Sequence, residues 1–165
     1  MSDTSPTFET RVLAFDDLDV RTSYEMWRLR QDVFVVEQGD PYDDLDGRDA
    51  EPGTRHVVLL GAGSGPEGDG GRVLGVARVL DDGDVRRIGR VVLAREARGR
   101  GLSAPLMEGA LRACAELDAE AGTALDVVLA AQSPLAGFYG GFGLVVEGEE
   151  FLDGHIPHLP MRLRR

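Results

Sequence analysis

The residues best suited to chemistry lie in the segment Arg98-Gly99-Arg100-Gly101-Leu102-Ser103. An apolar, β-branched run over Ile88–Leu93 precedes this segment and predicts a strand. Apolar residues then recur at helical spacing and predict an amphipathic helix; they are Leu102, Leu106, Ala110, Ala113 and Leu117. A glycine-rich turn at a helix start presents backbone N–H groups at the positive end of the helix dipole. The segment therefore predicts a binding site for a diphosphate, with Arg98 and Arg100 adding positive charge.

This turn lacks the spacings of the common nucleotide-binding motifs. The chain has no GxxxxGK[ST], and Gly99-Arg100-Gly101 is not followed by the third glycine of GxGxxG. The turn instead resembles motif A of the GNAT N-acetyltransferase superfamily, [RQ]xxGx[GA], whose amides hold the pyrophosphate of acetyl-CoA. Arg98, Gly99 and Gly101 are compatible with that pattern, whereas Ser103 stands where Gly or Ala is usual. Taken by itself, the segment is also compatible with an ordinary strand-to-helix connection.

The remaining elements predict one domain over residues 1–165, because this length and a hydrophobic content of 42% suit a single globular core. A loop is expected over Gly39–Gly53 and a hairpin tip over Gly61–Gly71. The predicted strands are Phe8–Phe15, His56–Leu60, Arg72–Leu80, Val85–Leu93, Leu125–Ala131, Val145–Val146 and Leu159–Leu163. The predicted helices are Val20–Gln38, the helix after the glycine turn, and Ser133–Gly141 with Ser133 as its cap.

This order of elements resembles the GNAT fold. The resemblance implies an α/β (α+β) domain with a mixed, mostly antiparallel sheet of about seven strands, flanked by helices and splayed at the acyl-CoA site. Ala136–Leu144 resembles the family segment A-x-x-F-Y-x-x-x-G-F, with Leu144 replacing the final aromatic residue. Three further stretches resemble the ElaA-like branch: Leu29–Gln38, Pro41-Tyr42 with Asp46-Gly47-Asp49, and Asp153–His158.

The resemblance implies an N-acetyltransferase that moves an acetyl group from acetyl-CoA to an amine by direct attack in a ternary complex. Tyr139 falls where many members carry the general acid, and a phenol with an ordinary pKa near ~10 is protonated at neutral pH. Its alternative is an aromatic residue that only packs the short helix. The cofactor-binding residues implied are Val91, Val92, Leu93, Arg98, Gly99, Arg100, Gly101, Leu102, Ser103 and Gln132.

The general base stays open at this point. Many members use a glutamate on the strand before the turn, but RRIGRVVL contains no carboxylate. That absence leaves solvent, a water chain or another residue as the proton acceptor. The candidate residues are His56, His155, His158, Glu37 and Asp46. Glu37, Gln38, Tyr42 and Asp46 are expected to cap the acceptor site, with His56 and His158 as further substrate contacts; the alternative is a solvated acidic loop.

Composition narrows the class of partner. The net charge is −11, from 29 acidic and 18 basic residues, and every basic residue is arginine. An acidic surface argues against nucleic-acid or anionic-membrane binding and favours a cationic acceptor, a small-molecule amine or a protein amino group. Acidic, lysine-free usage is also typical of high-GC or salt-adapted genomes. The chain has no apolar run of the ~20 residues that a membrane span needs and no signal-peptide pattern, so we expect a cytoplasmic protein, monomeric or homodimeric.

Other chemistries are disfavoured. Cys114 is the one cysteine and falls in mid-helix, so we expect a core residue, with no disulfide and no cysteine-based zinc site. The acidic residues between Asp43 and Asp49 lack the spacing of a calcium loop, and no metal is expected. A non-catalytic acyl-CoA-binding module remains the alternative function, and a different phosphate ligand is a third possibility.

Overall fold

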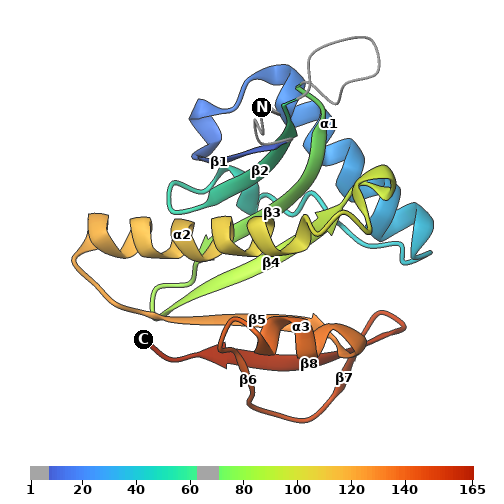
Figure 1. Cartoon of the computed structure of the whole chain (residues 1–165). Coiled ribbons are helices and arrows are strands. Elements are labelled where there is room, and N and C mark those ends of the chain that lie inside the picture. Colours follow the sequence, from blue (N-terminus) through green and yellow to red (C-terminus); the bar gives the residue numbers. More distant parts are fainter. Residues whose placement is uncertain (1–7, 63–70) are drawn as a thin grey trace, which may run out of the picture.

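The computed structural model describes residues 8–62 and 71–165, and their strands form a mixed sheet (Figure 1). The strands are β1 (Phe8–Leu13), β2 (Arg55–Gly61), β3 (Val73–Asp81), β4 (Val85–Leu93), β5 (Asp126–Gln132), β6 (Val145–Val146), β7 (Phe151–Asp153) and β8 (Ile156–Leu163). Their order is β1-β2-β3-β4-β5-β8-β6, with β7 also paired to β8. Every pairing is antiparallel except that of β4 with β5. The sheet adds β7 to the predicted strands; most of the predicted hairpin tip lies outside the described residues.

The helices match the predicted positions, with two local differences. They are α1 (Val20–Arg30), α2 (Ser103–Ala121) and α3 (Ala136–Gly140). The predicted helix over Val20–Gln38 is α-helical only to Arg30 and continues as a π-helical segment over Gln31–Glu37, which contains three β-branched valines. Ser133 does not cap the helix that follows: its hydroxyl donates to Glu150 Oε2 at 2.7 Å, and Gln132 precedes the helical turn.

Strand β2 separates two hydrophobic layers, which explains its continuous apolar run. Val57 and Leu59 belong to the core cluster that includes α2, whereas Val58 and Leu60 pack in a second cluster with Met26 of α1. Successive strand residues point to opposite faces, so a strand covered on both faces shows no polar alternation. Figure 1 shows α2 crossing one face of β1–β4.

Gly109 allows α2 to approach the sheet closely. An added Cβ would lie 2.7 Å from Val57 Cγ1 and 2.8 Å from Thr10 Cγ2. We expect Gly109→Ala to lower the free energy of unfolding by about 1–3 kcal/mol, although alanine favours helices. Urea denaturation measures this change. Gly137→Ala is the control, because an added Cβ in α3 meets nothing within 4 Å. A Gly109→Ala variant as stable as the unsubstituted protein would contradict the expected overlap.

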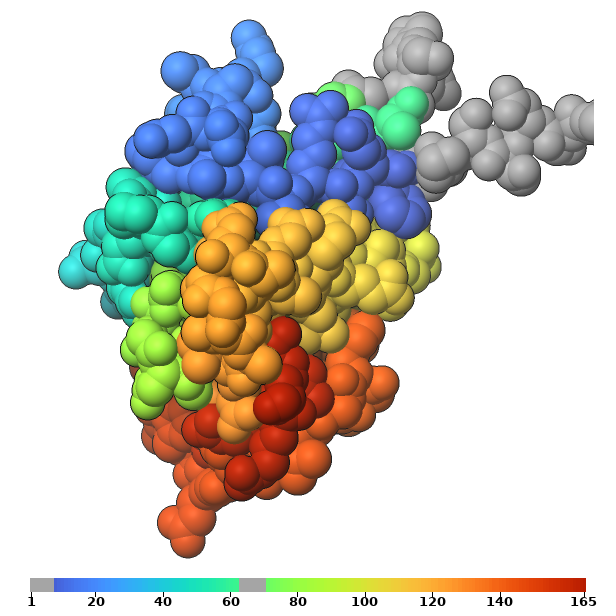
Figure 2. Space-filling model, turned by 90° about the vertical axis from the view of Figure 1, so that its left-hand side faces the viewer, coloured from blue at the N-terminus to red at the C-terminus, as the bar shows by residue number. Residues whose placement is uncertain are grey.

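The end of the chain lies against α2 (Figure 2). The Arg165 guanidinium pairs with Asp118 of α2, and its backbone N–H donates to Asp126 Oδ1 of β5 at 3.1 Å. Asp118 also accepts from Arg86 Nε of β4 at 3.0 Å. These contacts connect β4, β5 and α2 at the end of the sheet where the two parallel strands pair.

Candidate active site

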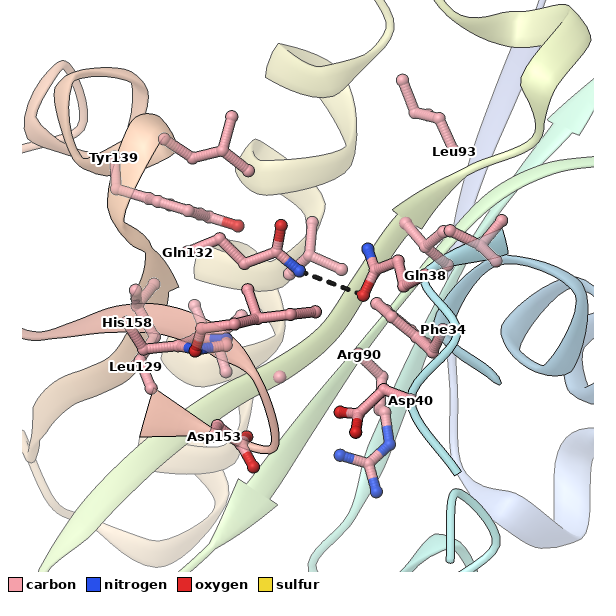
Figure 3. A pocket seen from close by; sticks show the side chains of 18 of the residues that line it. Phe34, Gln38, Asp40, Arg90, Leu93, Leu129, Gln132, Tyr139, Asp153 and His158 are labelled. Atoms are coloured by element: carbon pink, nitrogen blue, oxygen red, sulfur yellow. Dashed lines mark hydrogen bonds between the residues drawn. The ribbon is translucent and has the colours of Figure 1, made fainter. Parts of the chain in front are cut away.

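The two parallel strands of the sheet pair only at one end. The ladder joins Val85–Arg87 of β4 to Asp126–Val128 of β5, and beyond it the strands separate. A cavity of about 520 Å³ lies at this opening, with residues of both strands in its lining (Figure 3). The predicted splay of the sheet is therefore present, between β4 and β5.

Strand β4 bulges where it lines the cavity. Arg90 and Val91 together face Ala77 of β3, because the pairing of these strands shifts by one residue there. Arg90 has a φ of 51°, and no other non-glycine residue in the described ranges has a positive φ. The bulge interrupts the regular ladder at Arg90 and Val91, on the stretch of β4 that lines the cavity.

A buried arginine network holds the loop over residues 40–50 against the sheet. Arg30 of α1, 1% exposed, donates to Asp44 Oδ2 at 2.8 Å and to Asp49 Oδ1 at 2.7 Å. Arg78 of β3 donates to Asp46 Oδ1 at 2.8 Å and to Asp49 Oδ1 at 3.2 Å. Burial opposes ionisation of Asp49, but Arg30 outweighs that effect and holds the pKa of this carboxyl below its ordinary value.

The network is linked to the cavity through Arg90 and Tyr42. Arg90 Nε lies 2.8 Å from Asp44 Oδ1, and its guanidinium stands over the Tyr42 ring, 5.2 Å from the centroid. The Tyr42 hydroxyl donates to Asp44 Oδ1 at 2.7 Å. These contacts hold the Arg90 side chain against the network, and both Arg90 and Tyr42 line the cavity.

Two residues predicted at the acceptor site belong to this network instead and do not line the cavity. Burial opposes ionisation of Asp46, but its hydrogen bond from Arg78 outweighs that effect and holds its pKa well below the ordinary value. His56 is 1% exposed, and its Nε2 lies 2.9 Å from the backbone oxygen of Asp49. Burial lowers the pKa of His56. Both side chains are held by contacts within the network and lie outside the cavity lining, so we assign neither of them a role in the proposal below.

The glycine turn Arg98–Ser103 leads from β4 into α2, as predicted. Gly99 and Gly101 have φ values of 74° and 73°, which L side chains rarely adopt. An added Cβ at either glycine would meet nothing within 4 Å, so the space beside the turn is open. No side chain of the described residues caps α2 at Leu102, so the first N–H groups of the helix are available to an anion.

Glu37 extends from the π-helical segment to the glycine turn. It accepts hydrogen bonds from Arg98 Nη1 at 2.7 Å and from Nη2 at 2.9 Å. The hydrogen bonds from Arg98 hold the pKa of Glu37 below its ordinary value. Both residues line the cavity, but a carboxylate held in this way is a poor proton acceptor.

Tyr139 enters the cavity from α3. It is 7% exposed, and its ring packs edge-on against Phe138 with centroids 5.1 Å apart. Within the described ranges its hydroxyl has no hydrogen-bond partner, and Figure 3 shows it pointing toward the middle of the cavity. Burial raises the pKa of Tyr139 to about 12, so the phenol is protonated at neutral pH and can donate.

Gln38 and Gln132 form a hydrogen bond across the opening, which we call the glutamine bridge. Gln132 ends β5, and its Nε2 donates to Gln38 Oε1 at 3.3 Å. In Figure 3 the bridge crosses the cavity, with Tyr139 on one side and Asp40, Asp153 and His158 on the other. Both glutamines line the cavity, as do Val91, Val92 and Leu93 of β4.

Asp40 and Asp153 line the cavity, although sequence reasoning did not select them. Asp153 falls in the Asp153–His158 stretch, and Asp40 precedes Pro41-Tyr42, so the quoted motifs enclosed or adjoined both. A single carboxylate in a turn otherwise looks like a solvated residue. His158 also lines the cavity, whereas His155 is exposed, with its Nδ1 3.9 Å from Asp40 Oδ1.

The described residues also show where the single cysteine lies and whether they contain a metal-binding group or a membrane-spanning helix. Cys114 of α2 is buried in the core, and burial raises the pKa of its thiol to about 11. Residues 8–62 and 71–165 contain no group of three or more His, Cys, Asp or Glu side chains suited to a metal ion. In the same ranges, no helix has the length and apolar character needed to cross a membrane.

This chain resembles a family of acetyltransferases and several known proteins. A family model described as an acetyltransferase (GNAT) domain matches residues 67–165. A UPF0039 protein of Mycobacterium tuberculosis is 43% identical over 149 residues, which cover 88% of this chain and 86% of the relative. The protein ElaA of Escherichia coli is 33% identical over 156 residues, covering 93% and 94%.

Solved structures show the same relationship. The crystal structure of Escherichia coli ElaA matches with a TM-score of 0.80 and 31% identity, over 96% of this chain and 99% of that one. An acyl-CoA N-acyltransferase from Pseudomonas aeruginosa also matches with a TM-score of 0.80, at 34% identity and the same coverages of 96% and 99%. With its splayed sheet and open glycine turn, this chain belongs to the GNAT acetyltransferase family, in its ElaA-like branch, and is an acyl-CoA-dependent acyltransferase.

Proposed function

We propose that this protein transfers the acetyl group of acetyl-CoA to an amine by direct attack within a ternary complex. The observation that carries the proposal is the cavity between β4 and β5. Its lining joins Arg98 of the glycine turn, the bulged part of β4, and the protonated Tyr139. A cationic residue of the glycine turn, the bulge of β4 and a proton donor thus line one cleft.

Acetyl-CoA fits the groups present at this opening. The amides of the turn would hold its pyrophosphate, supported by the charges of Arg98 and Arg100. Val91, Val92 and Leu93 would hold the pantetheine arm along β4, where the neighbouring strand has separated, and Gln132 would contact the arm from β5. The cosubstrate supplies an activated thioester, and the protein supplies position and charge.

The transfer needs one bond to form and one to break. The amine nitrogen bonds to the carbonyl carbon, the carbon–sulfur bond breaks, and the departing thiolate receives a proton. We assign that proton to the Tyr139 hydroxyl, and stabilisation of the carbonyl oxygen to backbone N–H groups at the β4 bulge. Holding amine and thioester in one cavity supplies proximity.

The acceptor in this proposal is a small-molecule amine or a protein amino group. Asp40 and Asp153 place two carboxylates in the cavity lining, where they attract an ammonium group. The net charge of −11 also attracts a cationic acceptor to the protein.

Thermal unfolding with and without acetyl-CoA tests the proposal, with adenosine diphosphate as the ligand control. A ligand at about 100 times its dissociation constant adds roughly 2.7 kcal/mol to the free energy of unfolding. No shift at saturating acetyl-CoA would overturn the proposal. A shift without turnover of any primary amine in a panel would instead identify a non-catalytic acyl-CoA-binding module.

Gly101→Ala provides a sharper test of the glycine turn. The new Cβ would occupy open space where the pyrophosphate approaches, so we expect at least a tenfold weaker affinity for acetyl-CoA by titration calorimetry. Gly83→Ala is the matched control: its φ of 86° imposes similar strain, but it lies in the turn between β3 and β4. Equal losses of affinity in the two variants would show that the turn does not hold the ligand.

A further inference from the structure

The amine must lose a proton, and the carboxylates first considered for this role are occupied. Glu37 is paired with Arg98, and Asp46 with Arg78 outside the cavity. Strand β4 carries no carboxylate over Arg86–Leu93. The proton then goes to solvent, to a water chain or to a residue on another element that lines the cavity.

His158 of β8 has the geometry of a base. It is 9% exposed, lines the cavity, and faces Gln132 in the pairing of β5 with β8. Its Nδ1 lies 2.8 Å from the backbone oxygen of Ile156. A carbonyl oxygen only accepts, so Nδ1 carries the hydrogen and the neutral ring has its lone pair on Nε2. No hydrogen bond joins Nε2 to any residue that the structure describes.

Two further contacts define this end of the cavity. The His158 ring stacks on Phe151 of β7, with centroids 5.9 Å apart and 26° between the planes, which limits rotation of the imidazole. An added Cβ at Gly154 would overlap the Asp40 carboxylate, so the loop that carries Asp40 meets the turn between β7 and β8. Asp40 and Asp153 therefore bring negative charge to the same region as His158.

We propose that His158 Nε2 is the general base that takes the proton from the acceptor ammonium, while Asp40 and Asp153 attract that ammonium to it. This inference rests on the proposed function. Proton transfer to Nε2 leaves a neutral amine, whose lone pair attacks the thioester carbon as the carbon–sulfur bond breaks. The nitrogen then loses its second proton, which replaces the one that Tyr139 gives to the sulfur. The proton on His158 leaves to solvent, so the reaction releases one proton, the amide and the free thiol.

A comparison of two acceptors separates a base from a structural residue. An alkylamine such as 1,4-diaminobutane is protonated at pH 7.5 and needs the base, whereas methoxyamine is already neutral. We expect His158→Asn to lower kcat/KM for 1,4-diaminobutane about 10²-fold and to change that for methoxyamine less than threefold. Asparagine can still donate to the Ile156 oxygen, and His158→Gln is a second variant if the first fails to fold. Glu149→Gln, at an exposed position outside the cavity lining, is the control and should change neither value.

The outcomes are distinct. Equal losses with both amines, or no loss with either, would overturn the role of His158 while leaving acetyl transfer intact. If the unsubstituted protein acetylates neither amine, nor any primary amine of the panel, the proposed function fails and the base with it. Ring ¹⁵N NMR gives a readout without turnover: the neutral ring should carry its hydrogen on Nδ1, and a hydrogen on Nε2 would overturn the assignment.

Discussion

Replacing Tyr139 with phenylalanine is expected to lower kcat about 10²- to 10⁴-fold, with little change in the KM for acetyl-CoA. The substitution removes only the hydroxyl oxygen. Since that hydroxyl has no hydrogen-bond partner among the described residues, no buried group is left unpaired, and the edge contact with Phe138 remains. The loss would therefore report on proton donation to the sulfur and not on folding.

Tyr24→Phe is the matched control for this measurement. It removes the same atom from an α1 side chain that is 61% exposed and lies outside the cavity lining. Steady-state kinetics on both variants, with thermal unfolding to verify folding, gives the comparison. A Tyr139→Phe enzyme whose kcat stays within threefold of the unsubstituted protein would exclude the phenol as the acid.

The second large effect is expected in stability. Asp49→Asn removes the carboxylate shared by Arg30 and Arg78, which are both nearly inaccessible to solvent. Breaking a buried ion pair from one side leaves an uncompensated charge and typically costs about 3–5 kcal/mol. For a domain of this size the melting temperature should fall by roughly 6–20 °C. Urea denaturation measures this loss. An unchanged m-value would show that the free energy of unfolding has fallen without a change in the surface exposed on unfolding.

Asp32→Asn is the control for the loss of one carboxylate. Asp32 pairs with Arg28 at 3.7 Å, and both side chains are more than half exposed. Exposed pairs contribute little, so this variant should unfold almost like the unsubstituted protein. If the two variants had equal stability, the buried network would not be holding the loop over residues 40–50.

The lowered pKa of Asp49 also predicts how the free energy of unfolding changes with pH. Because the pKa of Asp49 is lower in the folded state than in the unfolded chain, its contribution is fully present above the unfolded value of ~3.9. It is lost as the pH falls through the folded-state pKa. Acid unfolding of Asp49→Asn should therefore show a weaker loss of stability below pH ~4 than that of the unsubstituted protein.

Much of the fold could be predicted because its signals are local. The strand before the turn, the glycines and the apolar face of α2 all lie between Ile88 and Leu117. Backbone conformation and helix starts depend on residues within a few positions of each other, so short windows of sequence contain them. The positive φ values of Gly99 and Gly101 follow from this kind of signal.

The distribution of polar groups could not be predicted in the same way. Asp46, Glu37, Gln38 and Tyr42 are close in the chain, and that closeness predicts that they lie together at the acceptor site. In the folded protein Asp46 is held by Arg78, 32 residues away, while Gln38 joins Gln132, 94 residues away. Asp40 and Asp153 reach one cavity from distant segments, and no spacing within either segment indicates this.

The order of elements, the glycine turn and the tyrosine on the short helix could therefore be predicted from local sequence. The separation of β4 from β5, the bulge of β4 and the set of ionisable groups without partners depend on how distant segments pack together. The physical reason is that a buried charge must find a partner. Arg30, Arg78 and Arg90 pair with Asp44, Asp46 and Asp49, which lie in a distant part of the chain. His158 Nε2 and the Tyr139 hydroxyl have no hydrogen-bond partners among the described residues.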